Sequence, residues 1–441
     1  MDAWRMNSSP VESTRPTSVR WVVLALLFAV SFAAYVQRLN FNVAGKFMIE
    51  DLGLSKAQLG WSISAFIACY TLFQLPGGMA GERFGSRRTL TWIVVLWGAF
   101  TLLTGLLPGL ILGGATLSLI SLLLVRALMG VFQAPVFPVL AGSIASWFPV
   151  ARWALPNALS SSGLTLGAMA TSPVVAWLAV TYGWRASLVL TAPFTLVIAA
   201  LWWWYARDEP AEHASVNAAE LRMIQAGRAP AQEESGKHPW LKVLANREVL
   251  LLTASYFCSN YAFYFFFSWF FIYLVEDRGF TALEGGFAAS VPWLTGALGA
   301  AIGGAICDWA CKRFGPRWGC RGPCVAALVL VAITLLIGAA VKNAYVALVF
   351  LSLAFALQQF TEGTYWAGTT FVAGRHTATA SGILNTGGNL VGILSTQMFV
   401  LLEDRFGAMV AVASGAVFAL LGAALWLLIR VDHPLQIEEK P

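Results

Sequence analysis

The sequence predicts an all-α membrane protein in which twelve transmembrane helices form two six-helix bundles. Composition and hydrophobic patterning lead to this prediction. Of the 441 residues, 58% are hydrophobic and only 11% are charged, whereas a soluble domain is about 25% charged. The hydrophobic residues gather in runs of about 20, the length that a helix needs to cross a hydrocarbon core of about 30 Å. These runs are too long for the strands of a membrane β-barrel, and they do not alternate between apolar and polar residues.

Roughly twelve such runs follow one another along the chain, and we interpret each as one helix. Short segments that carry charged residues or glycine separate the runs. The expected spans are residues 20–44, 57–80, 89–109, 115–142, 155–179, 185–206, 249–275, 285–308, 323–341, 344–372, 380–402 and 407–430.

A polar segment interrupts this series after the sixth run. It is rich in acidic residues, among them Asp208, Glu212 and Glu220. We therefore predict one bundle on either side of a linker. The expected divisions are a cytoplasmic N-terminal tail 1–19, an N-terminal six-helix bundle 20–206, a cytoplasmic linker 207–247, a C-terminal six-helix bundle 248–430 and a cytoplasmic C-terminal tail 431–441.

Lysine and arginine are distributed unevenly between the two sides of the membrane. With the N-terminus inside, twenty of the 28 fall in cytoplasmic segments and six fall outside. Basic residues favour the cytoplasmic loops of membrane proteins, so we expect both termini and the linker in the cytoplasm. This distribution also explains the net charge of +6 without a nucleic-acid partner, because the basic residues form no continuous face.

The two remaining arginines, Arg38 and Arg126, lie inside the first and fourth runs. A charge at the centre of a membrane helix costs about 2.5–3.5 kcal/mol or more, so such a residue usually has a function. Neither arginine has an acid in its own run. Two unpaired guanidinium groups suit bidentate binding of a carboxylate, and we predict that they hold an anionic substrate. The alternative is that each pairs with backbone carbonyls or helix ends.

A loop motif recurs at equivalent places in the two halves. Between runs two and three, and again between runs eight and nine, a glycine is followed four residues later by an acid and then by basic residues. The glycine allows helices to approach closely, and the acid can pair with a cation or a helix N-terminus across the contact. We predict conformational latches, with ordinary basic loop chemistry as the alternative. The predicted latch residues are Gly78, Glu82, Arg83 and Arg87 in the first half, and Asp308 and Arg313, after Gly304, in the second.

Three segments, together with this motif, resemble a known family. They are Tyr-Val-Gln-Arg-Leu-Asn at 35–40, Tyr-Thr-Leu-Phe-Gln-Leu-Pro-Gly-Gly at 70–78 and Arg-Ala-Leu-Met-Gly-Val-Phe-Gln-Ala-Pro at 126–135. The chain resembles the major facilitator superfamily over nearly its whole length. Within it, these segments are similar to the anion:cation symporter branch, which includes bacterial sugar-acid (galactonate) and phthalate transporters, sialin and the vesicular glutamate transporters. The resemblance implies transport of an organic anion across a plasma membrane, and specifically the inner membrane of a bacterium.

Further polar side chains are expected around the two arginines. Phenol groups, amides and an indole suit a carboxylated or hydroxylated ligand, although each could instead bond a neighbouring helix. The resemblance implies that Tyr70, Trp366 and Asn385 match binding positions of the sugar-acid transporters. The complete predicted substrate site is Arg38, Arg126, Tyr35, Tyr70, Gln133, Trp366, Asn385 and Asn389.

At two positions the chain departs from the pattern that the resemblance implies. The bacterial sugar-acid transporters carry an acid before the arginine of span one and another in span four, and these acids are associated with proton coupling. This chain has Gln37 and Gln133 there, and glutamine cannot titrate. Glu362 remains as an acid inside a run, and the proton affinity of a carboxyl depends on burial and on nearby cations. We predict that Glu362 couples protons to transport; a structural partner of an arginine or a gate residue is the alternative.

Two other patterns allow two interpretations each. Cys307, Cys311, Cys320 and Cys324 form two C-x3-C pairs. Because C-x2-C is the usual zinc spacing, we expect helix-end cysteines and no metal or other cofactor, with zinc as the alternative. The aromatic run 261–271 is expected to pack towards lipid, with the lining of an aromatic-acid pocket as the alternative.

The sequence thus predicts a secondary transporter, not an enzyme, that moves a sugar acid or another small carboxylate by alternating access. The expected partners are the anion, a proton as co-substrate and the bilayer, and the chain is expected to act as a monomer. One alternative is an organic-anion uniporter or exchanger without proton coupling. Another is a membrane sensor or receptor for an organic acid.

Overall fold

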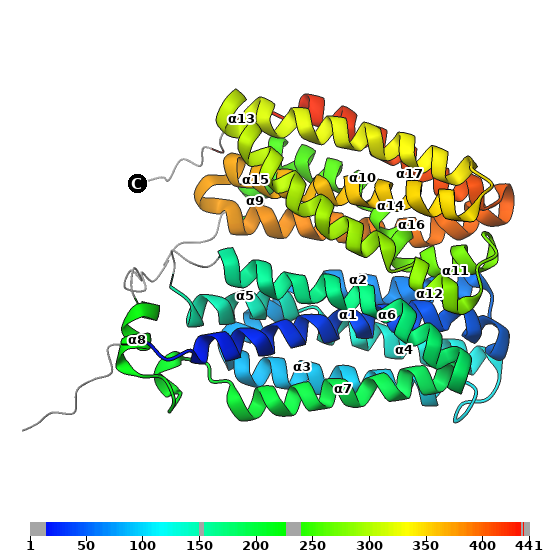
Figure 1. Cartoon of the computed structure of the whole chain (residues 1–441), viewed down its shortest axis with the longest axis horizontal. Coiled ribbons are helices and arrows are strands. Elements are labelled where there is room, and N and C mark those ends of the chain that lie inside the picture. The colour runs from blue at the N-terminus through cyan, green and yellow to red at the C-terminus, as the bar shows by residue number, and fades with distance from the viewer. Residues whose placement is uncertain (1–14, 150–153, 226–239, 434, 436–441) are drawn as a thin grey trace, which may run out of the picture.

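The chain folds into long helices that lie roughly parallel in two groups (Figure 1). The computed structural model describes residues 15–149, 154–225, 240–433 and 435. Within these ranges all regular elements are helical, apart from an isolated bridge between Pro108 and Leu112. The prediction of an all-α fold is therefore confirmed.

The first group of helices, which we name the first half, contains the elements up to residue 205. Its first helix pair shows why the chain turns where it does: Gly53 ends α1 in a left-handed conformation, and Ser55 caps α2 in a capping box with Gln58. The helices of the first half are α1 (Val19–Leu52), α2 (Lys56–Phe84), α3 (Ser86–Leu106), α4 (Ala115–Gln133), α5 (Val136–Trp147), α6 (Ala154–Tyr182) and α7 (Trp184–Tyr205).

The second group, the second half, begins at residue 247. Several of its helices are interrupted: α10 gives way to α11 at Trp269, and α14 to α15 at Thr361. Its helices are α10 (Arg247–Ser268), α11 (Phe270–Glu276), α12 (Ala282–Ala288), α13 (Val291–Ala340), α14 (Ala344–Phe360), α15 (Glu362–Ala373), α16 (Thr377–Phe406) and α17 (Ala408–Leu428), with a 3-10 turn at Gly374–His376.

Among the described residues, nine helical stretches are long and apolar enough to cross a membrane. One of them, Ala282–Ala340, spans 59 residues, and its α13 helix turns back at Gly315, whose φ is 79°. The predicted span 115–142 is divided into α4 and α5, with Ala134 and Pro135 between them. The chain is thus a multi-pass membrane protein, and the count of twelve spans stays a prediction.

Two glycine turns repeat between the halves. Gly85 ends α2 with φ 80°, and Gly315 bends α13 with φ 79°, a region that only glycine adopts readily. The turn at Gly85 is held by Asp208, which accepts hydrogen bonds from the Arg87 backbone N–H (2.7 Å) and the Ser86 hydroxyl (3.0 Å). The turn at Gly315 has a similar partner, because Arg317 lies 3.6 Å from Asp432. In each half, an aspartate after the last helix therefore contacts a residue next to the turn, by hydrogen bonds in the first half and by an ion pair in the second.

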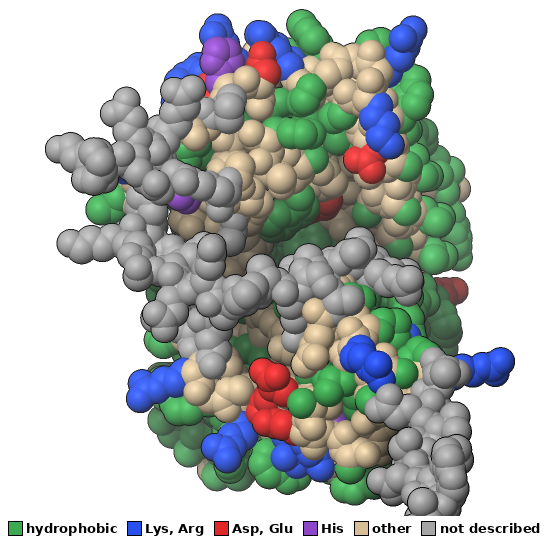
Figure 2. All heavy atoms as spheres, turned by 90° about the vertical axis from the view of Figure 1, so that its left-hand side faces the viewer, with side chains coloured by type: hydrophobic (Ala, Val, Ile, Leu, Met, Phe, Trp, Pro, Cys, Tyr) green, Lys and Arg blue, Asp and Glu red, His purple; other side chains and the backbone are tan. Residues whose placement is uncertain are grey.

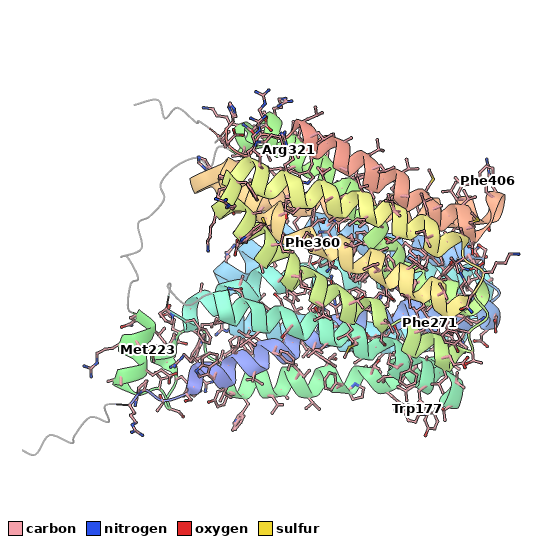
Figure 3. The ribbon with its side chains drawn as sticks, turned by 45° about the horizontal axis from the view of Figure 1, so that its top comes forward. Trp177, Met223, Phe271, Arg321, Phe360 and Phe406 are labelled. Atoms are coloured by element: carbon pink, nitrogen blue, oxygen red, sulfur yellow. The ribbon has the colours of Figure 1, made fainter. Side chains whose placement is uncertain are left out.

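The two ends of the molecule differ. We call the end that carries α8 (Ala218–Gln225) and α9 (Trp240–Leu244) the linker end, and the other end, with α11 and α12, the far end (Figure 1). Arg321 and Met223 lie at the linker end, whereas Phe406, Phe271 and Trp177 lie at the far end (Figure 3). The segment predicted as a linker contains helix α8, whose Glu220 binds Arg20 at 2.8 Å. Residues 226–239 of that segment lie outside the described ranges.

The hydrophobic core shows that the halves meet towards the far end and separate towards the linker end. One cluster of buried side chains draws on both halves, for example Leu39 and Ile63 with Phe265 and Phe399. Two other clusters stay within one half each, around Trp97, Trp147 and Trp202 in the first half and around Tyr365 and Trp426 in the second. Figure 2 shows a recess between the halves on the face of the linker end, and the basic side chains of this face lie mainly towards its upper and lower edges.

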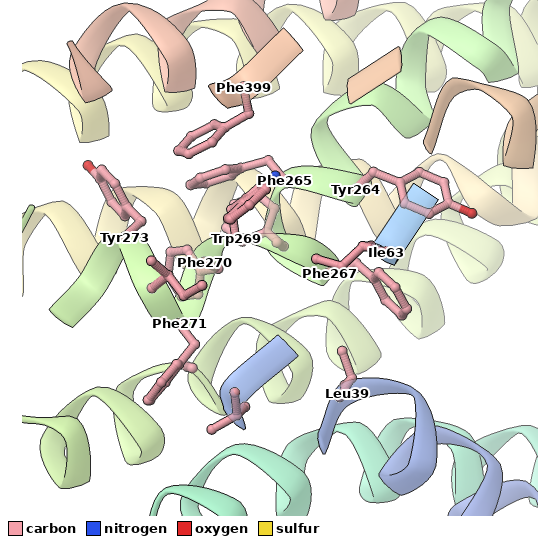
Figure 4. Close-up of a cluster of buried hydrophobic side chains, with 14 of the residues drawn as sticks. Leu39, Ile63, Tyr264, Phe265, Phe267, Trp269, Phe270, Phe271, Tyr273 and Phe399 are labelled. Atoms are coloured by element: carbon pink, nitrogen blue, oxygen red, sulfur yellow. The ribbon is translucent and has the colours of Figure 1, made fainter. Parts of the chain in front are cut away.

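The aromatic run 261–271 packs inside the protein, so the expectation that it faces lipid was wrong. Phe265, Phe266, Trp269 and Phe270 expose at most 5% of their surface. Phe265 stacks on Phe399 of α16 with ring centroids 5.3 Å apart, as Figure 4 shows. The run carries apolar residues at nearly every position. The sequence pattern therefore does not show which side of the helix faces lipid and which faces the protein interior.

Candidate functional site

Arg38 lies on α1 in a setting of aromatic rings and one amide. Its side chain is buried, and its Nε donates to Gln133 Oε1 at 2.7 Å. The guanidinium carbon lies 4.0 Å from the ring centre of Tyr70 and 5.3 Å from that of Tyr35. Ring faces attract a cation without neutralising its charge. One nitrogen, Nη2, is buried without a hydrogen-bond partner.

Arg126 on α4 is still less satisfied. It is 1% exposed, its Nη1 contacts the Met129 sulfur at 3.4 Å, and neither Nε nor Nη2 has a partner. Its guanidinium lies 4.4 Å from the ring centre of Phe41 and 4.6 Å from that of Phe66. The Phe66 ring is also 5.7 Å from Arg38, so both cations share one ring. No acid pairs with either arginine in the described part of the chain.

The two glutamines Gln37 and Gln133 make different contacts. Gln133 lies in the site, where it accepts from Arg38 and donates to the Ala34 carbonyl at 3.0 Å. Gln37 points into the interior of the first half instead. Its amide donates to the Thr191 carbonyl at 3.0 Å, and its oxygen accepts from Thr101 at 2.8 Å. Gln37 therefore joins α1 to α7 and α3, and Gln133 is the neutral partner of the cation.

Glu362 begins α15, at the break after α14. Its carboxylate accepts hydrogen bonds from the Tyr256 hydroxyl at 3.0 Å and from the Trp366 indole at 3.2 Å. Glu362 and Trp366 are four residues apart, one helical turn, which brings the indole against the carboxylate. Trp366 is 39% exposed, and Phe360, two residues before Glu362, lies away from both ends of the molecule (Figure 3).

The asparagines of α16 lie on one helix face, and one of them reaches the other half. Asn389 donates to the Asn385 carbonyl at 2.8 Å and accepts from the Tyr264 hydroxyl at 2.8 Å. The Asn385 amide donates to Gln74 of α2 at 3.0 Å. Sequence reasoning did not indicate this bond between the halves, because it depends on how α2 and α16 pack.

Reasoning from the sequence also missed an ion-pair cluster at the far end. Lys56 of α2 binds Glu403 and Glu276 of the second half, each at 2.8 Å, and Lys46 lies 3.6 Å from Glu276. Deeper in the molecule, Asn42 donates to the Phe267 carbonyl at 2.7 Å. Every described ion pair between the halves lies at this end, so the far end is closed in this conformation.

The predicted latch residues whose side chains the structure describes do not meet across the halves. Arg87 donates to the Trp203 carbonyl through Nη2 at 2.6 Å and lies over the Trp203 ring, all within the first half. Arg83 is exposed beside Phe84, and Asp308 and Arg313 are exposed on the second half. The side chain of Glu82, and Gly78 apart from its place in α2, lie outside the described part. A latch between the halves stays a prediction.

Comparison with known proteins places this arrangement in a family. The family model described as Major Facilitator Superfamily matches residues 27–396. A probable galactarate/D-glucarate transporter of Bacillus subtilis is 31% identical over 95% of this chain and 94% of its own length. The Escherichia coli K12 protein of the same name is 30% identical, covering 100% and 99%. A probable sulfoacetate transporter of Cupriavidus necator is 29% identical, covering 94% and 96%.

The fold of the chain is also similar to that of solved structures. The crystal structure of a bacterial homolog to the human lysosomal transporter Spinster, in an inward-facing and unoccupied conformation, superposes with a TM-score of 0.77. It covers 94% of this chain and 97% of its own at 17% identity, which supports the fold alone. The relatives named as organic-acid transporters confirm the resemblance drawn from the sequence, and the chain belongs to the major facilitator superfamily.

Proposed function

We propose that this protein is a secondary transporter of a small organic dianion of the sugar-acid class. One observation carries the proposal: the buried guanidinium groups of Arg38 and Arg126 share the Phe66 ring and lack an acidic partner among the described residues. A buried cation without a partner is unstable unless a ligand or water satisfies it. An anion is the ligand that satisfies both.

The charge of the site favours a substrate with two negative charges. Arg38 keeps its full charge because its side-chain partner, Gln133, is neutral. Two arginines therefore face the ligand, and each can bind one carboxylate or sulfonate group by two parallel hydrogen bonds. Relatives named for galactarate/D-glucarate and for sulfoacetate support this class, because each of these acids carries two acidic groups.

Glu362 is proposed to couple the movement of a proton to that of the substrate. It lies on the second half, hydrogen-bonded to Tyr256 and Trp366 and without a basic partner in the described part of the chain. A carboxyl takes up a proton where burial disfavours its charged form and releases it where water reaches it, so alternating access would let this group move a proton. Trp366, Asn385 and Asn389 are proposed to contact the remainder of the substrate.

The proposal includes the arrangement in the membrane. The basic side chains at the linker end (Figure 2) support a cytoplasmic linker and cytoplasmic termini, and the Escherichia coli relative supports a bacterial inner membrane. Twelve spans follow if α13 is counted as two helices that meet at Gly315 and if α2 and α16 each cross. Rocking of two six-helix bundles, 20–206 and 248–430, would then expose the site alternately. The loop residues Glu82 and Asp308 would hold the cytoplasmic side closed.

Uptake into proteoliposomes tests this function. The purified chain is reconstituted, and accumulation of labelled galactarate is measured with and without an inwardly directed proton gradient. We expect accumulation above the external concentration only with the gradient. Unlabelled diacids should compete more strongly than the monoacid galactonate, and neutral sugars should not compete. Competition by neutral sugars alone would contradict the anion proposal.

The same uptake assay tests proton coupling separately from anion binding. If galactarate enters or exchanges equally well with and without the gradient, the chain is a uniporter or an exchanger, which the neutral Gln37 and Gln133 favour. If the chain binds galactarate in a thermal-shift assay but moves none, it is a sensor. Each result would replace the symport mechanism while leaving the anion site in place.

A further inference from the structure

Three cysteine thiols meet where the two legs of α13 come together at the linker end. The sulfurs of Cys307 and Cys311 lie 4.0 Å apart, and those of Cys311 and Cys320 lie 3.6 Å apart. All three sulfurs lie within 4.8 Å of one another. Cys307 and Cys320 are buried, while Cys311 is partly exposed. The cluster is separate from the arginine site, and a role for it does not depend on the proposed transport function.

Local structure explains why the thiols converge. Cys307 and Cys311 are four residues apart, so they lie on one face of the first leg. Gly315 reverses the chain with φ 79°, and the second leg returns along that face. Gly319 then allows the legs to touch, because a Cβ at this position would overlap the Cys311 backbone. Cys320, the next residue, is thereby placed against Cys311.

The spacing of the sulfurs matches a thiolate metal site. Zinc binds cysteine sulfur at about 2.3 Å in tetrahedral geometry, which places neighbouring sulfurs about 3.8 Å apart. The two sulfur–sulfur distances, 3.6 Å for Cys311–Cys320 and 4.0 Å for Cys307–Cys311, lie on either side of that value. We propose that Cys307, Cys311 and Cys320 form a binding site for a thiophilic cation of the zinc type, with three thiolate ligands and one open position.

The surroundings of the three thiols include a further polar group. The buried side chain of Thr364 lies with its hydroxyl beside the Cys307 thiol. Cys324 is buried one turn beyond Cys320 but is not part of the three-sulfur group. The sequence spacing predicted helix-end cysteines, and the three-dimensional arrangement favours the zinc alternative.

A bound cation would tie the two legs of α13 together beside the loop that carries Asp308 and Arg313. A Cys-to-metal clamp fixes both legs relative to each other, because every ligand must keep its position for the metal to stay bound. The loop between the legs would lose freedom when the metal binds. Metal binding should therefore raise the thermal stability of the protein.

Cobalt titration of the full-length protein tests the site. The detergent-purified, reduced chain is stripped with a chelator, and Co²⁺ is added under argon while the near-ultraviolet absorption is recorded. We expect a thiolate-to-cobalt band that saturates at one equivalent, that Zn²⁺ removes, and that accompanies a rise in melting temperature. Cys320→Ser should weaken binding at least about tenfold, since even changes behind the ligands weaken metal sites 10–100-fold.

Matched variants separate a metal site from a folding effect. Cys258→Ser and Cys324→Ser remove free thiols outside the three-sulfur group and should leave the band unchanged. Cys311→Ser provides a second ligand variant should Cys320→Ser fail to fold, and the melting temperature without metal reports folding directly. Absence of the band in the wild-type protein would overturn the proposal. So would a band of equal strength in a folded Cys311→Ser or Cys320→Ser protein.

Discussion

The two halves of the molecule hold side chains of opposite charge among their helices. The first half holds Arg38 and Arg126, both buried and without an acidic partner in the described part of the chain. The second half holds Glu362, which accepts hydrogen bonds from a phenol and an indole. Under the proposed function, the first half binds the anion and the second half carries the proton. Mutations should therefore change substrate binding and proton coupling separately, because the residues proposed for each lie in different halves.

The largest expected effect comes from removing a cation of the first half. Arg126→Ala should weaken galactarate binding about 100-fold or more, because two charge-assisted hydrogen bonds contribute about 1.5–3 kcal/mol each. Isothermal titration of the purified protein measures the loss. Arg126→Lys keeps the charge without the planar donor pair and should be intermediate. Arg185→Ala removes an arginine that pairs with Asp51 at the far end and should bind normally. Unchanged binding in Arg126→Ala would remove the basis of the anion site.

The second prediction concerns the acid of the second half. Glu362→Gln should abolish accumulation driven by a proton gradient while leaving exchange of labelled for unlabelled galactarate, because only the protonatable group is lost. Proteoliposome uptake measures both. Glu248→Gln is the matched control, since Glu248 is a buried acid of the second half that accepts from the Arg430 backbone at 2.7 Å. Gradient-driven accumulation that survives Glu362→Gln would separate Glu362 from coupling.

A third, smaller effect is expected when an acid is added to the first half, which holds the two arginines. Gln133→Glu should give Arg38 a charged partner at the present 2.7 Å contact and lower the affinity for dianions about tenfold. Competition by the monoanion galactonate should weaken less than competition by galactarate. Gln133→Leu removes the hydrogen bond without adding charge, so it separates the two causes. Equal losses for monoanion and dianion would contradict the charge argument.

The smallest effect is expected at the far end, where the halves are joined by ion pairs. Lys56→Gln removes the contacts to Glu276 and Glu403, which, as partly exposed pairs, contribute about 0.2–1 kcal/mol each. We expect a cysteine placed at Asn42, buried between the halves, to react a few-fold faster with a water-soluble thiol reagent. Lys342→Gln, outside these ion pairs, should not change the rate. A rate unchanged by Lys56→Gln would show that packing alone closes this end.

The sequence was sufficient to predict the elements whose signal is local. Arg38 and Arg126 were found because a charge in an apolar run is costly. Glu362 and Trp366 are one helical turn apart, and the structure joins them by a hydrogen bond. The glycines of the loop motif, Gly78 and Gly304, lie within α2 and α13, whereas Gly85 and Gly315 make the turns that follow.

Residues whose role depends on packing between distant helices could not be predicted. Gln37 and Gln133 are both glutamines on membrane helices, yet one lies inside the first half and the other in the site. The cluster of Lys56, Glu276 and Glu403 joins segments more than 200 residues apart. The cysteine cluster depends on the angle at which Gly315 and Gly319 return the chain. A one-dimensional pattern contains none of these distances.

The hydrogen bond between Asn385 and Gln74 has a consequence for the timing of the transport cycle. Asn385 is a proposed substrate ligand, and its amide donates to Gln74 of the opposite half. If a substrate hydroxyl accepts a hydrogen bond from the Asn385 amide, Gln74 loses this donor. The halves then lose one hydrogen bond between them when the substrate binds. The substrate would thus compete with Gln74 for the Asn385 amide. A transporter with bound substrate and one without it would therefore differ in how readily the two halves separate.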